Sequence, residues 1–193
     1  MKYIITGLHS SGKLETVQQL ISNGIHVGHM FTNVEHPEYH TDLYDVYQID
    51  EINRIFENQA YVYFSEVENS ISNNYEGLSA HEFDNNDVFV MTPNQLNTLP
   101  MKSLPSDVCF VWMDCNTNNR IARFKAEKRQ YDFKRRDEIE RLDLSDFIDK
   151  IYNLPNSRII YFSNEDPQRV AALIEIMVKY PETARTITKY FND

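Results

Sequence analysis

The sequence predicts an α/β fold in which helices cover both faces of a parallel sheet, giving three layers. Short apolar runs alternate along the chain with stretches whose apolar residues recur at helical spacing. Most of these runs lack polar alternation, which is typical of parallel strands buried on both faces. With 193 residues, 41% of them hydrophobic, the chain is long enough for one domain with a substantial core.

The first quarter of the chain predicts a strand, a helix and a second strand. Residues 2–6 (KYIIT) are apolar and β-branched, as in a buried strand. Residues 14–21 place apolar side chains at helical spacing, and residues 24–28 (GIHVG) suit a short strand. Residues 29–41 have the composition of turns, and helical periodicity returns over 49–58 with Asp50 as the expected N-cap.

The remaining elements continue the alternation. Residues 61–67 predict a strand, a polar turn follows, and 78–85 predict a short helix. Residues 88–91 (VFVM) and 108–113 (VCFVWM) predict buried strands. The last expected elements are helices over 116–130 and 133–153, a strand over 158–162 and a helix over 167–179, with Pro167 in its first turn.

Composition and net charge limit the classes of protein that fit. The net charge of −10 argues against broad nucleic-acid binding, and no apolar run is long enough to span a bilayer. The first apolar run is too short for the core of a signal peptide. The two cysteines, Cys109 and Cys115, are expected to be buried thiols in a reducing cytosol. We therefore expect a cytoplasmic protein with no membrane or nucleic-acid partner.

The charges are unevenly distributed along the chain. Residues 35–87 hold thirteen Asp or Glu and one basic residue, Arg54. Residues 120–141 hold nine Lys or Arg and five acids. The basic stretch is consistent with a solvated helix held by i,i+4 ion pairs, and equally with a clamp for an anion such as phosphate.

The segment that follows the first strand has the pattern of a phosphate-binding loop. Gly7-Leu8-His9-Ser10-Ser11-Gly12-Lys13 matches G-x-x-x-x-G-K between a strand and a helix. Glycines let such a loop curl its N–H groups inward, and the helix N-terminus adds partial positive charge. We expect Gly7, Ser10, Ser11, Gly12 and Lys13 to bind the phosphates of ATP within a P-loop NTPase fold, with a purely structural strand-to-helix turn as the alternative. The hydroxyl residue that normally follows the Lys and holds Mg²⁺ is replaced by Leu14.

Four segments resemble the guanylate kinases, a branch of the P-loop nucleoside monophosphate kinases, and together the resemblance covers nearly the whole chain. Residues 44–67 (YDVYQIDEINRIFENQAYVYFSEV) follow the family's Tyr, acidic helix, I-E-N-G-E-F and A-E-V pattern without a gap. The other segments are similar to the family's N-Y-Y-G-T-S, I-E-R-R-L and V-I-V-N-D patterns: residues 74–79 (NYEGLS), 139–142 (IERL) and 159–166 (IIYFSNED).

The resemblance implies one domain with three parts and a set of site residues. Its core would span 1–30 and 86–193, a small acceptor-binding lobe about 31–85, and a helical lid about 123–141. Lys13, Arg123 and Arg141 would be catalytic, and Asn164 would lie near the donor adenine. Tyr44, Glu66 and Tyr75 would bind the acceptor, a (deoxy)nucleoside monophosphate such as (d)GMP.

The chain also departs from the family's pattern. Residues 31–42 contain no Arg where the family has two, and each lost contact to an acceptor phosphate could cost about 1.5–3 kcal/mol. Glu76 stands where a phosphate-binding Tyr is expected, and Pro93 replaces the usual Asp. Thr16 and Asp114 are the remaining candidates to hold Mg²⁺ with ATP.

Several residues also have structural interpretations. Glu66 also suits a strand edge, Asp114 a helix N-cap, Tyr44 a core or surface aromatic, and Arg141 an i,i+4 partner of Asp137. For the whole chain, the sequence leaves a kinase open beside a degenerate domain that binds a protein partner through its acidic lobe. A third alternative is a P-loop protein whose acceptor carries less negative charge than a nucleotide.

Overall fold

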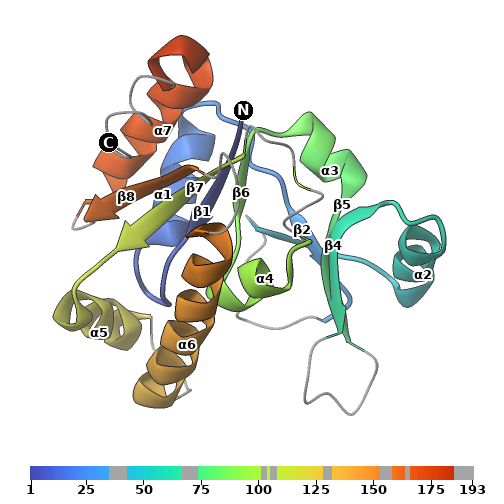
Figure 1. The fold of residues 1–193 in the computed structure, drawn as a ribbon, viewed down its shortest axis with the longest axis horizontal. Helices are drawn as coiled ribbons and strands as arrows, with labels where there is room; N and C mark the ends of the chain where they lie inside the picture. Colours follow the sequence, from blue (N-terminus) through green and yellow to red (C-terminus); the bar gives the residue numbers. More distant parts are fainter. Residues whose placement is uncertain are drawn as a thin grey trace.

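The computed structural model describes residues 1–34, 43–66, 74–100, 104, 108–127, 132–152, 158–163 and 166–184. Two four-stranded sheets lie side by side (Figure 1). The larger sheet has the strand order β6-β1-β7-β8, and the smaller one β3-β2-β5-β4. The predicted α/β fold with a parallel sheet is confirmed for the larger sheet, in which all pairs are parallel.

The larger sheet is formed by β1 (Lys2–Thr6), β6 (Val88–Val90), β7 (Val108–Asp114) and β8 (Arg158–Ser163). Alternate residues of β1 enter different hydrophobic clusters. Tyr3 and Ile5 pack with α1 (Lys13–Ser22) and α7 (Pro167–Lys179), which lie together on one face. Ile4 packs in a second cluster with α4 (Pro93–Thr98) and α6 (Phe133–Tyr152), so the sheet is covered on both faces.

The smaller sheet comes from the stretch between α1 and β6. It contains β2 (Met30–Thr32), β3 (Tyr44–Val46), β4 (Tyr61–Glu66) and β5 (Tyr75–Ser79). Strand β5 pairs antiparallel with β2 and β4, whereas β2 and β3 are parallel. Helix α2 (Ile49–Glu57) lies at the outer edge and α3 (Ala80–Asn85) leads back to the larger sheet (Figure 1). We call residues 29–86 the small-sheet lobe.

The lobe packs on the rest of the protein through apolar side chains. Met30, Tyr63, Leu78 and Phe83 belong to the same cluster as Ile4. The chain enters and leaves the lobe at neighbouring positions, because the Gly28 N–H donates to the Val88 carbonyl at 2.8 Å. Val27 also forms a parallel bridge with Val88. One of the two core layers therefore continues into the lobe.

Several sequence-based expectations are wrong in detail. Of the strand expected over 24–28, a single bridge at Val27 is observed. Helix α2 begins after Gln48, whose N–H donates to the Glu51 carboxylate at 3.0 Å, so Asp50 is not its N-cap. Leu78 and Ser79 belong to β5, and the helix expected over 78–85 begins at Ala80. Strands β2, β3 and β5 and helix α4 were not predicted.

The other expected helices and strands agree with the described residues. The helices expected over 116–130 and 133–153 appear as α5 (Thr117–Ala126) and α6. Cys109 and Cys115 are buried thiols, as expected. Within the part of the chain that the structure describes, none of the helices combines the length and the apolar character needed to cross a membrane.

Candidate functional site

The loop between β1 and α1 owes its shape to two glycines. Gly7 has a φ of +150°, and a Cβ there would lie 2.5 Å from the Met113 carbonyl oxygen, so β7 can pass close to the loop. Gly12 is the N-cap of α1 and adopts the left-handed conformation, with φ 98°. Ser10 also has a positive φ of 53°. The backbone therefore turns sharply from the strand into the helix.

Lys13 is the first residue of α1 and folds back over the loop. Its Nζ donates to the carbonyl oxygens of Gly7, at 2.7 Å, and Leu8, at 2.9 Å. The Ser10 hydroxyl is buried and has no hydrogen-bond partner among the described residues. An ammonium, an unmet hydroxyl and a helix N-terminus at one turn fit the oxygens of a phosphate group.

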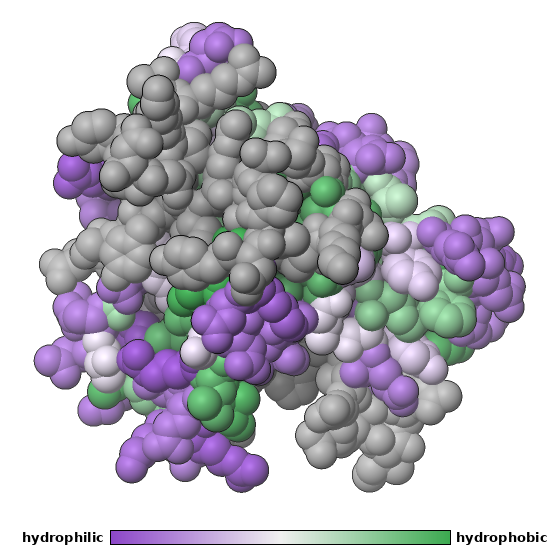
Figure 2. Space-filling view, viewed as in Figure 1, coloured by the Kyte–Doolittle hydropathy of each residue, from purple (hydrophilic) through white to green (hydrophobic). Residues whose placement is uncertain are grey.

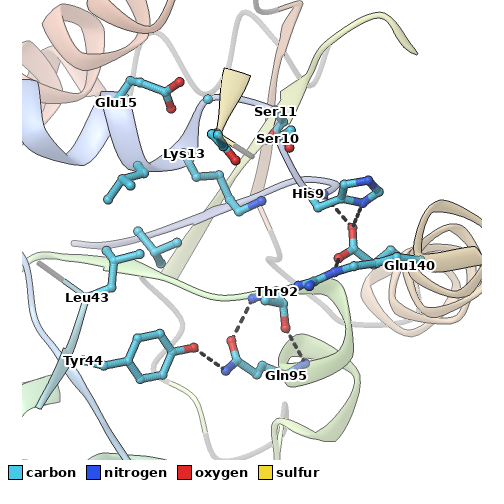
Figure 3. A pocket seen from close by; sticks show the side chains of 15 residues that line it. His9, Ser10, Ser11, Lys13, Glu15, Leu43, Tyr44, Thr92, Gln95 and Glu140 are labelled. Atoms are coloured by element: carbon cyan, nitrogen blue, oxygen red, sulfur yellow. Dashed lines mark hydrogen bonds and ion pairs between the residues drawn. The ribbon is translucent and has the colours of Figure 1, made fainter. Parts of the chain in front are cut away.

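A cleft with a volume of about 130 Å³ runs between this loop and the small-sheet lobe. Lys13 projects into it above Tyr44, Thr92 and Gln95, while His9 and Glu140 lie at its side (Figure 3). The lining residues come from the loop and α1, the start of β3, the end of β6, α4, the C-terminal end of α5 (Thr117–Ala126) and α6. They are His9, Ser10, Ser11, Gly12, Lys13, Leu14, Glu15, Leu43, Tyr44, Val90, Thr92, Gln95, Glu127, Arg136 and Glu140.

The lobe side of the cleft is a chain of hydrogen bonds centred on Gln95. Its Nε2 donates to the Tyr44 hydroxyl and to Glu76 Oε2, each at 3.0 Å. The Tyr63 hydroxyl donates to Glu76 Oε1 at 2.9 Å. Burial raises the pKa of Glu76 above its ordinary value, although the hydrogen bonds that Glu76 accepts from Tyr63 and Gln95 oppose the shift. Burial and the neighbouring Glu76 also raise the pKa of Tyr63.

Gln95 is fixed by the start of α4. The Thr92 hydroxyl accepts from the Gln95 N–H at 3.3 Å, and the Gln95 side chain accepts from the Thr92 N–H at 2.8 Å. This reciprocal cap holds the amide in position while its Nε2 points to Tyr44 (Figure 3). The lobe side of the cleft therefore presents hydroxyl and amide groups on a rigid support.

The opposite side of the cleft carries an ionic cluster on α6. Glu140 Oε2 accepts from the His9 N–H at 2.5 Å and lies 3.1 Å from His9 Nδ1, while Oε1 accepts from Arg136 Nε at 2.9 Å. Burial alone would raise the pKa of Glu140. The hydrogen bond from His9 and the charges of Lys13 and Arg136 outweigh it and lower the pKa to about 2.

A second ionic group joins α5 to α6. Arg120 is fully buried and is ion-paired with Asp137, which also accepts from Arg141 Nε at 2.9 Å. Burial of Asp137 would raise its pKa, but the hydrogen bonds from Arg141 and Arg120 lower it. Arg120 also lies 5.4 Å from the centre of the Phe133 ring.

The structure brings part of the sequence-predicted site together. Ser10, Ser11, Gly12, Lys13 and Tyr44 line one cleft, and Gly7 lies at the base of the loop. Tyr44 thus lies on the side facing Lys13, and its hydroxyl is held by Gln95.

Other predicted residues do not line the cleft. Arg123 Nη1 donates to Cys115 Sγ at 3.4 Å, and Arg141 is half-exposed and paired with Asp137. Glu66 is exposed at the end of β4, where it pairs in register with Tyr75 of β5. The Tyr75 ring packs against Phe64 with 5.3 Å between centroids. Asn164 lies outside the described residues.

The metal-ligand candidates do not face the cleft together. The Thr16 hydroxyl is buried and points to the Pro167 carbonyl, at 3.4 Å, and to Met113 Sδ, at 3.8 Å. Asp114 ends β7 and is absent from the cleft lining, whereas the apolar Leu14 is part of it. The loop therefore fits a phosphate group, but in this arrangement Thr16 does not offer Mg²⁺ a ligand in the cleft.

Sequence reasoning missed several charged or polar groups of the cleft, among them Gln95, to which no role was assigned. His9 was counted only as a loop position, and Arg136 only as one of nine basic residues. Glu140 lay inside the IERL segment, but no role was assigned to it. The spacing of Arg136 and Glu140 indicated an ion pair along α6, yet the contact with the loop joins residues 131 positions apart.

No protein-family model matches the sequence, and no curated protein matches it. Solved structures do match the fold. One of them is a guanylate kinase from Anaplasma phagocytophilum, with a TM-score of 0.56 and 16% sequence identity. The match covers 93% of this chain and 84% of that protein. The chain therefore has a guanylate kinase-like fold.

Proposed function

We propose that this protein is a nucleoside monophosphate kinase-like phosphotransferase that binds ATP on the Gly7–Lys13 loop. The observation that carries the proposal is the loop itself. Lys13 and the N-terminus of α1 face a cleft at the end of a parallel strand, and Gly12 makes the turn. Ser10 and Ser11 would lie beside the donor phosphates, and Asn164 beside the adenine.

The acceptor would lie across the cleft, on the side of the small-sheet lobe. Tyr44 would bind it there, and the sequence resemblance adds Glu66 and Tyr75 for a (deoxy)nucleoside monophosphate such as (d)GMP. Phosphoryl transfer depends mainly on positioning and on neutralising negative charge. Lys13 would supply positive charge within the cleft, and Arg123 and Arg141 would have to approach it from α5 and α6.

Magnesium would enter with the ATP. It would neutralise charge on the phosphates, with Thr16 and Asp114 as the ligands expected from the sequence. The Thr16 hydroxyl is directed to Pro167 and Met113. We therefore expect the main ligands of the Mg²⁺ ion to be oxygens of the nucleotide and water.

The direct test is calorimetric titration with Mg·ATP, then with GMP, dGMP, dTMP and dCMP, followed by an ADP-release assay on each pair that binds. We expect Lys13→Ala to abolish turnover and to weaken ATP binding at least tenfold, because it removes the ammonium from the loop. Circular dichroism should show an unchanged fold.

Lys134→Ala is the matched control. It removes the same charge from an exposed side chain on α6 that does not line the cleft, so ATP binding and turnover should stay within twofold of the unchanged protein. Normal turnover by the Lys13→Ala protein would show that the loop assignment is wrong.

A second candidate is a protein-binding domain without phosphoryl transfer. It is favoured by the exposed acids of the small-sheet lobe, among them Asp50, Glu51 and Glu57 on α2, and by the direction of the Thr16 hydroxyl. ATP binding without any acceptor would support a nucleotide-dependent binding domain. Failure to bind ATP would move the search to basic protein partners of the lobe.

A further inference from the structure

The Glu140 carboxylate ties helix α6 to the loop. One of its oxygens accepts the His9 backbone N–H at 2.5 Å and lies 3.1 Å from the His9 ring, while the other accepts from Arg136. Only 7% of the residue is exposed. The carboxylate is thus a buried anion at the side of the cleft, held by a backbone N–H of the same loop that carries Lys13 (Figure 3).

This contact has the chemistry of an anion bound to a loop. A backbone N–H at a strand-to-helix turn, together with nearby cations, is what a phosphate oxygen would seek. Lys13 and Arg136 both stabilise the negative charge of Glu140. A triphosphate that enters the cleft would therefore compete with the Glu140 carboxylate for the positive charges of Lys13 and Arg136.

Aromatic rings pack beside the contact between Glu140 and His9 and extend it to the start of α6 and to α5. The His9 ring meets the Phe133 ring at the start of α6 with 4.4 Å between centroids, and Phe133 meets Phe124 of α5 at 5.3 Å. A shift of Glu140 away from His9 would therefore disturb the first turns of α6 as well. His9 thus connects the loop to α6 at two places, Glu140 and Phe133.

We infer that Glu140 is an internal anion that occupies a phosphate-binding position of the loop, so that a triphosphate binds by displacing it and α6 moves with the carboxylate. The inference rests on the proposed binding of triphosphate at this loop. To that function it adds a role for Glu140, which would set the affinity for the triphosphate, and a movement of α6 when the triphosphate binds.

The test is calorimetric titration with sodium tripolyphosphate and with Mg·ATP at pH 7.5 and low salt. Glu140→Gln keeps the shape of the side chain but removes its charge, so we expect it to bind tripolyphosphate at least tenfold more tightly than the unchanged protein. Glu138→Gln is the control, because it removes the same charge from an exposed position on the same helix. Its affinity should stay within twofold.

Hydrogen exchange on the unchanged protein gives a second readout, which does not depend on the variant folding. Saturating tripolyphosphate should speed amide exchange several-fold in the first half of α6. Unchanged exchange there, or equal or weaker binding by the Glu140→Gln protein, would overturn the displacement.

Lys13→Ala separates this inference from the function on which it rests. If tripolyphosphate binds, Lys13→Ala weakens it and Glu140→Gln leaves it unchanged, the loop binds phosphate but the displacement is refuted. If tripolyphosphate binds to none of the proteins, the proposed function fails and the displacement fails with it.

Discussion

Glu76 and Glu140 are two largely buried carboxyl groups whose pKa values are shifted in opposite directions. Glu140 lies among cations and accepts a backbone N–H, and its pKa is lowered to about 2. Glu76 accepts hydrogen bonds from the neutral Tyr63 and Gln95, and burial raises its pKa. The difference comes from the charge of the partners, because the ionised form needs compensation once water is removed.

The two groups predict opposite pH dependences of stability. The pKa of Glu140 is lower in the folded state than in the unfolded state. Its contribution to the free energy of unfolding is therefore fully present at pH values above its ordinary pKa of about 4.3. It is lost as the pH falls toward 2, and amounts to about 3 kcal/mol. Glu140→Gln should therefore be less stable than the unchanged protein at pH 7 and equally stable near pH 2.

For Glu76, whose pKa is raised, the sign is reversed. Its contribution is complete below its ordinary pKa and declines as the pH rises through the raised value. Glu76→Gln should gain stability relative to the unchanged protein between pH 4 and pH 8. Urea unfolding from pH 2 to pH 8 measures both effects, with the exposed Glu66→Gln as a control. Parallel curves for Glu76→Gln and the unchanged protein would contradict this assignment.

At the scale of elements, the joint between α5 and α6 depends on Asp137. Asp137→Asn removes the carboxylate charge that pairs with Nη2 of the buried Arg120. Nε and Nη1 of Arg120 have no hydrogen-bond partner among the described residues, so the guanidinium has little other compensation there. We expect a loss of about 3–5 kcal/mol in the free energy of unfolding.

Arg141→Gln is the comparison for this prediction. It removes the exposed partner of the same carboxylate and should cost less than about 1 kcal/mol. The measurement is urea unfolding of both variants. Equal losses would show that burial of Arg120 does not decide the energetics of the joint.

The elements that the sequence predicted best are those buried on both faces. Strands β1, β6 and β7 are nearly continuous apolar runs, and α1 and α7 have clear helical periodicity. The small-sheet lobe was predicted less well. Strand β3 is only three residues long, and β5 contains Gly77 and Glu76 within a polar context. Such strands exist through their pairing with β2 and β4, which no local pattern reveals.

The candidate site also has a part that the sequence predicted and a part that it did not. The Gly7–Lys13 loop was predictable because order along the chain and glycine spacing define it locally. The contacts of Glu140 with His9 and of Gln95 with Tyr44 join distant segments. The charge pattern of α6 could equally describe a solvated helix, so tertiary packing alone decided which of its acids faces the loop.

Across the whole molecule, the two sheets are supported unequally. Strand β1 lies between β6 and β7 with a hydrophobic cluster on each face. Among the described residues, the fully buried apolar side chains of the lobe belong mainly to the second cluster, and the outer edge of the lobe over α2 is hydrophilic (Figure 2). We predict that native-state hydrogen exchange is at least tenfold slower in β1 and β7 than in β3 and β4. Equal protection in both sheets would mean that the molecule opens only as one unit.

The neighbouring entry and exit of the small-sheet lobe also have a consequence for how such a chain can change over time. The segment leaves the main sheet beside Val88 and returns to it there, so a different folded insert could replace it without altering the order of strands β6-β1-β7-β8. The replacement would need to supply apolar side chains in place of Met30, Tyr63, Leu78 and Phe83. Recombination could thus exchange the part of the cleft that Leu43 and Tyr44 supply and leave the Gly7–Lys13 loop and α4 unchanged.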